Sequence, residues 1–423
     1  MKTRHPFRSF LVGATLARLG DDMSGPALLL AGLAATGSAS SAAGLLAGLT
    51  ASAAVGGPVL GALLDRAGRP GHLLAWALVL HAGALAAILT GLGRLPLFAL
   101  ALMAVLAGLL GPALSGGWTA QLPRVLPAAR LPRGTALDAM TYDAASLIGP
   151  AGAGALAGVA GASSGVLVAA VLICAAFPCA WMLPTGGEPT APRNPYRPAP
   201  RQLLGDVGAG FRALVRTRSL ARATVTSVIC CAGSGMLITC APLLGTRSLG
   251  SAGLGTALLS VVAAAALTAN ALLARSPSML SPDAVLCWSA LPLAVGCLLA
   301  ATGVPALLIT AMAVAGLAEG PQLTALFAIR HREAPEPLRG RIFTTGASLK
   351  ITGFALGAGV AGPLAERSLP GTLVAAAGCH LAAALAFAWI TTARRRHSAG
   401  SHRSRDTGLA VSPGDRPALR SRS

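Results

Sequence analysis

The stretch Gly61-Ala62-Leu63-Leu64-Asp65-Arg66-Ala67-Gly68-Arg69-Pro70 sets an acid and two arginines between two long apolar runs. The runs, 41–63 and 71–92, each match the roughly 20 residues that a helix needs to cross the hydrocarbon of a bilayer. Glycine and proline in the stretch favour a turn. We therefore interpret it as a short charged loop that joins two membrane-spanning helices.

The same alternation of apolar runs and polar breaks continues along the whole chain of 423 residues. It predicts an all-α membrane protein with twelve transmembrane helices in two bundles of six. The first bundle is expected over 10–184, with spans at 10–34, 41–63, 71–92, 95–119, 136–160 and 164–184. The second is expected over 219–392, with spans at 219–245, 250–274, 284–303, 304–328, 341–363 and 369–392.

Three further segments lie outside the predicted spans. Residues 1–9 form a short N-terminal segment, and residues 185–218 form a linker rich in proline and arginine. Proline stiffens such a linker, and its second half is expected to form a short interfacial helix. The basic tail 393–423 is rich in Arg, Ser, Gly and Pro, a composition typical of disorder.

Composition agrees with a membrane protein. Apolar residues make up 54% of the chain and charged residues only 11%, against about 25% charged in soluble domains. The net charge of +19 raises the alternative of a nucleic-acid partner, but the arginines lie in short groups between apolar runs. They fit the anionic lipids of a membrane surface, so we expect no nucleic acid as a partner.

Loop charges predict the topology. Cytoplasmic loops carry the excess of Lys and Arg. With the N-terminus inside, the outer loops contain only Arg94, Arg247 and Arg367, while Arg18 and Lys350 lie within spans and every other basic residue is inside. Both termini are therefore predicted to be cytoplasmic, in a multi-pass protein of the inner cell membrane.

An internal repeat supports two related bundles. The segment 107–112 resembles 315–321, and both contain a Gly-Pro pair. The same offset aligns 61–66 with 270–275. Duplicated units of this kind are common in secondary transporters.

The loop after the second span resembles the signature of the major facilitator superfamily, a glycine followed by apolar residues, Asp-Arg, Gly and a basic residue. The location and the twelve-span count also match that family. The resemblance implies that Asp65 faces the start of the eleventh span, near Arg341, as a latch that favours the outward-facing state. A carboxylate there would be stabilised by the helix N-terminus. The residues assigned to the latch are Gly61, Asp65, Arg66, Gly68 and Arg69.

A second motif in the fifth span partly matches the Gly-Pro signature of antiporters in that family. It comprises Gly149, Pro150, Gly152 and Gly154, with Ala153 where the family has a glycine. The alternative reading is helix packing through small residues. The basic residue that antiporters of the family carry in the fourth span is missing from 95–120, which puts proton–drug antiport in doubt.

Ionisable residues at membrane depth are costly and usually functional. Arg18 is spaced to pair with Asp21 or Asp22 on its own helix, which would make it structural. Glu319 and Lys350 are expected to meet across adjacent helices, either as a coupling or substrate site or as a fixed ion pair. The candidates for proton coupling or substrate binding are Arg18, Asp21, Asp22, Asp143, Glu319 and Lys350.

Other polar residues receive structural readings. His81 and His380 fall in spans that are peripheral in the family and are interpreted as packed neutral histidines. Asp138 is interpreted as a first-turn acid, and Asn270 as a helix-packing residue. The eight cysteines show no metal-ligand spacing, so no metal and no cofactor are expected.

These observations predict a secondary transporter, not an enzyme, since no nucleophile is placed beside a base. We expect a monomer that exports an amphipathic small molecule, with protons as the coupling ion. The alternatives are import of a small metabolite, or a membrane scaffold or sensor that transports nothing.

Overall fold

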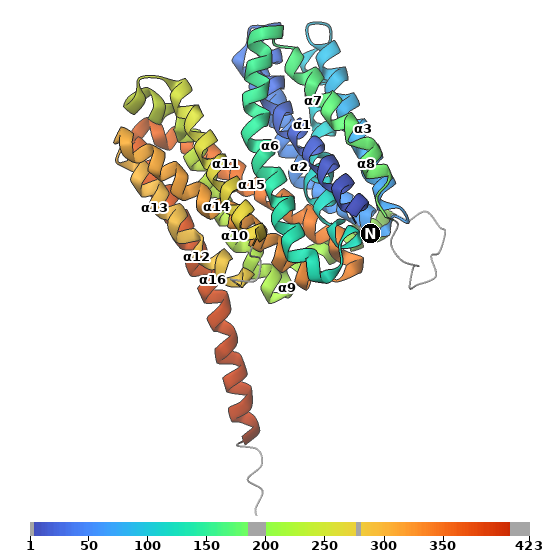
Figure 1. Ribbon diagram of the computed structural model, residues 1–423, viewed down its shortest axis with the longest axis vertical. Helices are drawn as coiled ribbons and strands as arrows, with labels where there is room; N and C mark the ends of the chain where they lie inside the picture. Colours follow the sequence, from blue (N-terminus) through green and yellow to red (C-terminus); the bar gives the residue numbers. More distant parts are fainter. Residues whose placement is uncertain (1–3, 185–199, 276–280, 407–423) are drawn as a thin grey trace, which may run out of the picture.

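The computed structural model describes residues 4–184, 200–275 and 281–406 (Figure 1). These residues are almost entirely helical and contain no strand. They form twelve transmembrane helices in two pseudo-symmetric bundles of six, which confirms the predicted fold class.

The first bundle contains the spans predicted between residues 10 and 184. Its helices are α1 (Arg4–Thr36), α2 (Ala39–Arg66), α3 (Pro70–Gly91), α4 (Leu97–Gly108) with η1 (Ala113–Gly117), α6 (Leu131–Ala160), and α7 (Ser164–Ala175) with α8 (Phe177–Trp181). The short α5 (Leu122–Val125) and η2 (Ala128–Arg130) lead into α6. One continuous apolar core, from Phe10 to Leu183, holds these helices together.

The second bundle repeats the arrangement around a core of its own. Its helices are α10 (Arg218–Leu244) with η3 (Gly245–Leu249), α11 (Ala252–Arg275), α12 (Pro282–Trp288) with α13 (Ala290–Ala301), α14 (Pro305–Glu333), α15 (Arg339–Arg367) and α16 (Leu369–Asp406). The sequence repeat has a structural counterpart, because Gly108 packs closely on α2 and Gly316 packs closely on α11.

Hydropathy separates the spans into two groups. Within the described ranges, nine helical stretches are long and apolar enough to cross a membrane. The other three spans are α1, α6 and α15, with 33, 30 and 29 residues. At about 1.5 Å per residue they are long enough for a hydrocarbon core of ~30 Å, but they are more polar. These three helices carry most of the candidate site residues.

The two bundles are close together at one end and apart at the other (Figure 1). The N-terminus and α9 (Pro200–Arg216) lie at the end where the bundles meet, which we call the closed end. Contacts between the bundles join α2 to α15 and α6 to α11. The opposite end, which we call the splayed end, has short loops with left-handed glycines at Gly37, Gly93, Gly161, Gly250 and Gly303.

The linker and the tail, which lie outside the predicted spans, each contain a helical segment. The second half of the linker forms a helix as expected, α9, and in addition this helix packs against α2, α10 and α15 with Leu214 buried. Helix α16 runs on to Asp406, into the segment expected to be disordered. Ala and Arg favour helix, and no proline interrupts the chain there. Residues 185–199 of the linker and 407–423 of the tail lie outside the described residues.

Candidate functional site

A cavity of about 590 Å³ lies between the two bundles. The first bundle contributes α1 and α6 to its wall, and the second contributes α10, α11, α13, α14 and α15. Most lining side chains are apolar, including Leu259, Val262 and Phe354. A mostly apolar cleft with a few convergent polar groups is typical of a small-molecule site.

Four of the six predicted site residues line this cavity: Asp22, Asp143, Glu319 and Lys350. Asp22 accepts a hydrogen bond from Ser146 Oγ at 3.0 Å. Glu319 and Lys350 share the cavity wall, but these two described residues form no direct ion pair. The expected contact between them is therefore absent in this conformation.

Asp143 belongs to a polar chain that joins the two bundles. Asn270 Nδ2 of α11 donates to Asp143 Oδ2 of α6 at 2.6 Å, and Asn270 Oδ1 accepts from Thr324 Oγ1 of α14 at 2.7 Å. Asn270 is fully buried, and in these two contacts each of its polar side-chain atoms has a partner. The sequence reading of Asn270 as a packing residue missed this role, because spacing within one helix does not reveal a partner on another bundle.

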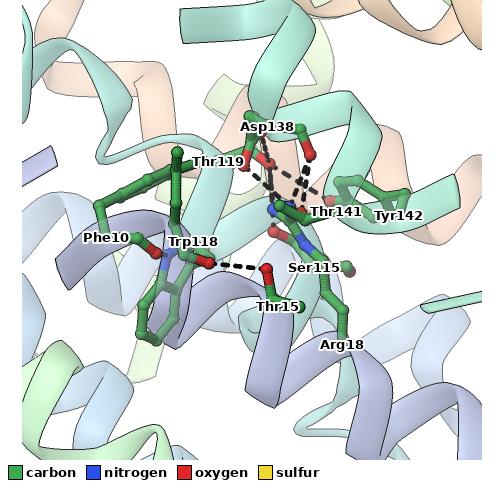
Figure 2. Close-up of polar contacts among 10 residues, drawn as sticks. Phe10, Thr15, Arg18, Ser115, Trp118, Thr119, Asp138, Thr141 and Tyr142 are labelled. Carbon is green, nitrogen blue, oxygen red and sulfur yellow. Dashed lines mark hydrogen bonds and ion pairs between the residues drawn. The ribbon is translucent and has the colours of Figure 1, made fainter. Parts of the chain in front are cut away.

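Arg18 makes a different contact from the one predicted. Figure 2 shows its guanidinium directed at α6, where Nη1 bonds Asp138 Oδ1 at 2.8 Å and also contacts Thr141 Oγ1. Nη2 donates to Thr119 Oγ1 at 2.8 Å. Arg18 and Asp138 are 2% and 0% exposed. The ion pair therefore joins α1 to α6, and not to Asp21 or Asp22 within α1.

The Arg18–Asp138 pair supports the floor of the cavity. The guanidinium carbon of Arg18 lies 3.7 Å from the ring centroid of Tyr142, which lines the cavity. Tyr142 packs on Phe327 with ring centroids 5.5 Å apart, and Phe327 packs on Phe343 at 6.0 Å. Tyr142 comes from the first bundle and the two phenylalanines from the second, so these rings join the bundles between the cavity and the closed end.

Arg330 lies beyond this aromatic floor. Loop counting placed it among the cytoplasmic loop residues, but α14 extends through it and it is only 1% exposed. Its guanidinium carbon lies 5.9 Å from the Phe343 ring centroid. Nε and Nη2 of Arg330 have no hydrogen-bond partner among the described residues. A buried cation therefore sits at the contact that would have to open.

Asp65 lies against the start of α15, the position that the family resemblance implied for it. Its carboxylate accepts hydrogen bonds from the backbone N–H groups of Gly340 at 2.6 Å and Arg341 at 3.0 Å, and it lies 3.3 Å from Arg341 Nε. Helix α15 begins after Leu338, which provides no side-chain cap. Asp65 therefore caps α15 from the other bundle, where a carboxylate satisfies unpaired donors and favours the positive end of the helix dipole.

Small residues bring α2 against α15 beside this cap. A Cβ on Gly61 would overlap Thr344 and Arg341, and a Cβ on Gly57 would overlap Thr344 and Ser348. Ser348 Oγ donates to the backbone oxygen of Ala53 at 2.5 Å. Gly57 was not singled out in the sequence, although the four-residue spacing of Ala53, Gly57, Gly61 and Asp65 marks a single helix face.

The remaining motif residues have more peripheral places. Gly68 and Arg69 are exposed in the loop between α2 and α3, and Arg66 ends α2. In the Gly-Pro motif, Pro150 lines the cavity. Gly149 and Gly152 pack on α1 at Asp22 and Met23, whereas the space beside Gly154 is open. Two glycines of this motif therefore pack against another helix, as the helix-packing interpretation of the motif predicts.

Comparison with known proteins agrees with this architecture. The sequence profile of the Major Facilitator Superfamily matches residues 10–279. No curated protein sequence matches the chain. Fold and cavity define a multi-pass membrane transporter. The chain belongs to the Major Facilitator Superfamily, whose members are transporters and not enzymes.

Solved structures share the fold across nearly the whole chain. The human organic anion transporter TETRAN has a TM-score of 0.74 at 17% identity, covering 92% of this chain and 100% of that chain. The fucose:proton symporter FucP of E. coli has a TM-score of 0.69 at 15% identity, covering 92% and 99%. A bacterial homologue of the iron transporter ferroportin, in an outward-facing state, has a TM-score of 0.70 at 15% identity, covering 92% and 99%.

Proposed function

We propose that this protein exports a positively charged amphipathic compound across the cell membrane in exchange for protons. The observation that carries the proposal is the composition of the central cavity. Three carboxyl groups, from Asp22, Asp143 and Glu319, face it against the single ammonium of Lys350, and the rest of the wall is mostly apolar. An apolar body would pack on the wall, while a cationic group would be attracted by the excess of carboxylates.

Exchange with protons follows from the same carboxyl groups. A carboxylate that binds a proton loses its charge and with it much of its attraction for a cation. Proton and substrate would therefore compete, and the coupling free energy between them is reciprocal. Glu319 is suited to this competition because no direct ion pair with Lys350 commits its charge in this conformation.

We place both termini in the cytoplasm, following the distribution of loop charges. The closed end would then face the cytoplasm and the splayed end the outside, so the structure would correspond to an outward-facing state. A reporter fused after residue 392 would be active in the cytoplasm under this arrangement. Activity of that reporter only in the periplasm would contradict it.

Inside-out vesicles test the proposal directly. The probe is tetraphenylphosphonium, a lipophilic cation, and the lumen is made acidic by an imposed gradient. We expect gradient-dependent accumulation of the probe by the wild type and its loss in Glu319→Gln. The matched control is Glu366→Gln, which changes an exposed glutamate at the splayed-end terminus of α15 and should transport normally.

The alternatives give different results in the same assay. A metabolite importer would move its cargo out of inside-out vesicles and would ignore the lipophilic cation. A scaffold or sensor would move no compound in either direction. Accumulation of a lipophilic anion in place of the cation would overturn the assigned charge of the substrate.

A further inference from the structure

Asp21 and Asp22 are neighbours in sequence, but their side chains serve different places. Asp22 lines the central cavity, whereas Asp21 does not. Oδ1 of Asp21 lies 3.7 Å from Nε2 of His81, on α3. Because consecutive residues of an α-helix point about 100° apart, α1 presents one carboxyl group to the cavity and the other to the interior of its own bundle.

The hydrogen atoms of His81 can be assigned from its contacts. The side chain is 1% exposed, and Nδ1 lies 3.0 Å from the backbone oxygen of Ala107. A carbonyl oxygen only accepts, so Nδ1 must carry the hydrogen in the neutral ring. Nε2 then presents a lone pair toward Asp21. It has no hydrogen-bond partner among the described residues.

An ionised Asp21 also only accepts hydrogen bonds. Two acceptors therefore face each other inside the bundle, and one of them is fully buried. Leaving a buried acceptor unsatisfied is costly. A single proton removes the conflict, either on Asp21 as O–H donating to Nε2, or on Nε2 as N–H donating to the carboxylate.

We propose that Asp21 and His81 together form a proton-binding site, separate from the central cavity, that holds one proton between the two side chains. Asp21 is 29% exposed, so protein atoms do not enclose the carboxyl group on all sides and a proton could reach the pair from that side. The two atoms would approach from 3.7 Å to hydrogen-bond distance when the proton binds. Protonation would therefore draw α1 toward α3.

Other ionisable groups on the surrounding helices are engaged elsewhere. On α1, Arg18 is bound to Asp138 and Asp22 faces the cavity; on α3, His72 stacks on Trp181 with ring centroids 3.8 Å apart. The others are Arg4, His5 and Arg8 in the first turns of α1, Asp65 and Arg66 in the last turn of α2, Arg133 at the start of α6, Tyr142 and Asp143 of α6 at the cavity, and Cys174 and Cys179 of α7 and α8, while α4 has none. In the part of the chain that the structure describes, no third ionisable side chain is hydrogen-bonded or ion-paired to Asp21 or His81.

The consequence for transport rests on the proposed function. Helix α1 would carry the coupling proton on one face and contact substrate on the other. Movement of α1 caused by protonation at Asp21 would then also move Asp22, the next residue, which lines the cavity. The site itself needs no substrate, so it can be tested separately from transport.

Infrared spectroscopy of the purified protein in lipid, recorded while pH is varied, is the test. We expect a protonated-carboxyl C=O band that titrates in the wild type and is lost in Asp21→Asn. The midpoint of that band should shift in His81→Gln. The matched control is His380→Gln, a buried histidine of the second bundle, and it should leave the band unchanged.

A second measurement keeps the test valid where His81→Gln does not fold. In Asp21→Asn the amide can donate to Nε2, so this variant mimics the protonated pair and should fold. Its His81 nitrogen NMR signals should then stay those of a neutral ring across the pH range in which the wild-type pair titrates. The proposal fails if Asp21→Asn retains the titrating band, or if both histidine variants shift it equally. Absence of transport with these signals intact would refute only the proposed function.

Discussion

Replacing Asp65 by Asn tests how the two bundles are held together at the closed end. The carboxylate, 5% exposed, accepts two backbone N–H groups at the start of α15 and pairs with Arg341. Asn retains one acceptor oxygen. Its NH₂ group would oppose the N–H of Arg341, so one hydrogen bond and the charge are lost together.

The magnitude follows from these contacts. A hydrogen bond to a charged group contributes about 1.5–3 kcal/mol net, and a carboxylate at a helix N-terminus contributes about 0.3–1 kcal/mol, or up to ~2 when partly buried. Together they give a loss of roughly 2–4 kcal/mol for the closed end. At about 1.4 kcal/mol per tenfold change, the ratio of this conformation to the opposite one should fall roughly 30- to 700-fold.

Distances between two spin labels, measured by double electron–electron resonance, can report the ratio of the two conformations. Labels at Ala35 and Leu254, both exposed at the splayed end, should report shorter distances in Asp65→Asn as that end closes. The labels are best introduced as unnatural amino acids, because the eight native cysteines would also react. The control is Asp283→Asn, which, like Asp65→Asn, removes a carboxylate at the closed end. The partners of Asp283 are Arg222 and Arg332, which lie within its own bundle. Unchanged distances in Asp65→Asn, or equal changes in both variants, would refute the reasoning.

Three other substitutions probe the remaining contacts. Gly61→Ala should also disfavour the closed end, because its Cβ would overlap α15, whereas Gly44→Ala on the same helix has open space and should leave the spin distances unchanged. Asp138→Leu should lower the free energy of unfolding by about 3–5 kcal/mol, because it leaves the Arg18 charge buried without a partner. Thermal unfolding should show this loss and its partial recovery when Arg18→Met is added, and a single-variant loss below about 1 kcal/mol would count against the pair. Asn270→Ala should slow substrate exchange in reconstituted vesicles, because it removes the hydrogen-bond donor to Asp143 of α6. An exchange rate in this variant equal to that of the wild type would show that this bridge between the bundles is dispensable.

Much of the fold could be predicted because membrane helices carry a strong local signal. Apolar runs of sufficient length mark the spans, and the family resemblance placed Asp65 against the start of the eleventh span, where its two backbone hydrogen bonds are found. Helices α1, α6 and α15 are more polar than the other spans, yet their lengths and positions between marked loops identified them.

The pairing of polar residues could not be predicted in the same way. Arg18 is four residues from Asp22 on one helix, but it binds Asp138 on another. The sequence gives the face of a helix on which a residue lies, and not the rotation of that helix against its neighbours. Asn270 and Arg330 were missed for the same reason, since their roles depend on the contact between bundles.

The contact between α2 and α15 at the closed end combines close packing with little buried apolar side chain. Ala53, Gly57 and Gly61 of α2 let the backbones of the two bundles approach. Because these side chains are so small, little apolar surface becomes exposed when α2 and α15 separate. Most of the specific stabilisation of this α2–α15 contact must then come from Asp65 and Ser348, whose hydrogen bonds water can replace once the end opens. The Tyr142, Phe327 and Phe343 rings join the bundles separately, nearer the cavity. An interface held by large apolar side chains would cost about 25 cal/mol for every Å² exposed on opening. At this contact, small residues closed by one carboxylate instead keep the cost of separation low, as the proposed exchange between two conformations of similar free energy requires.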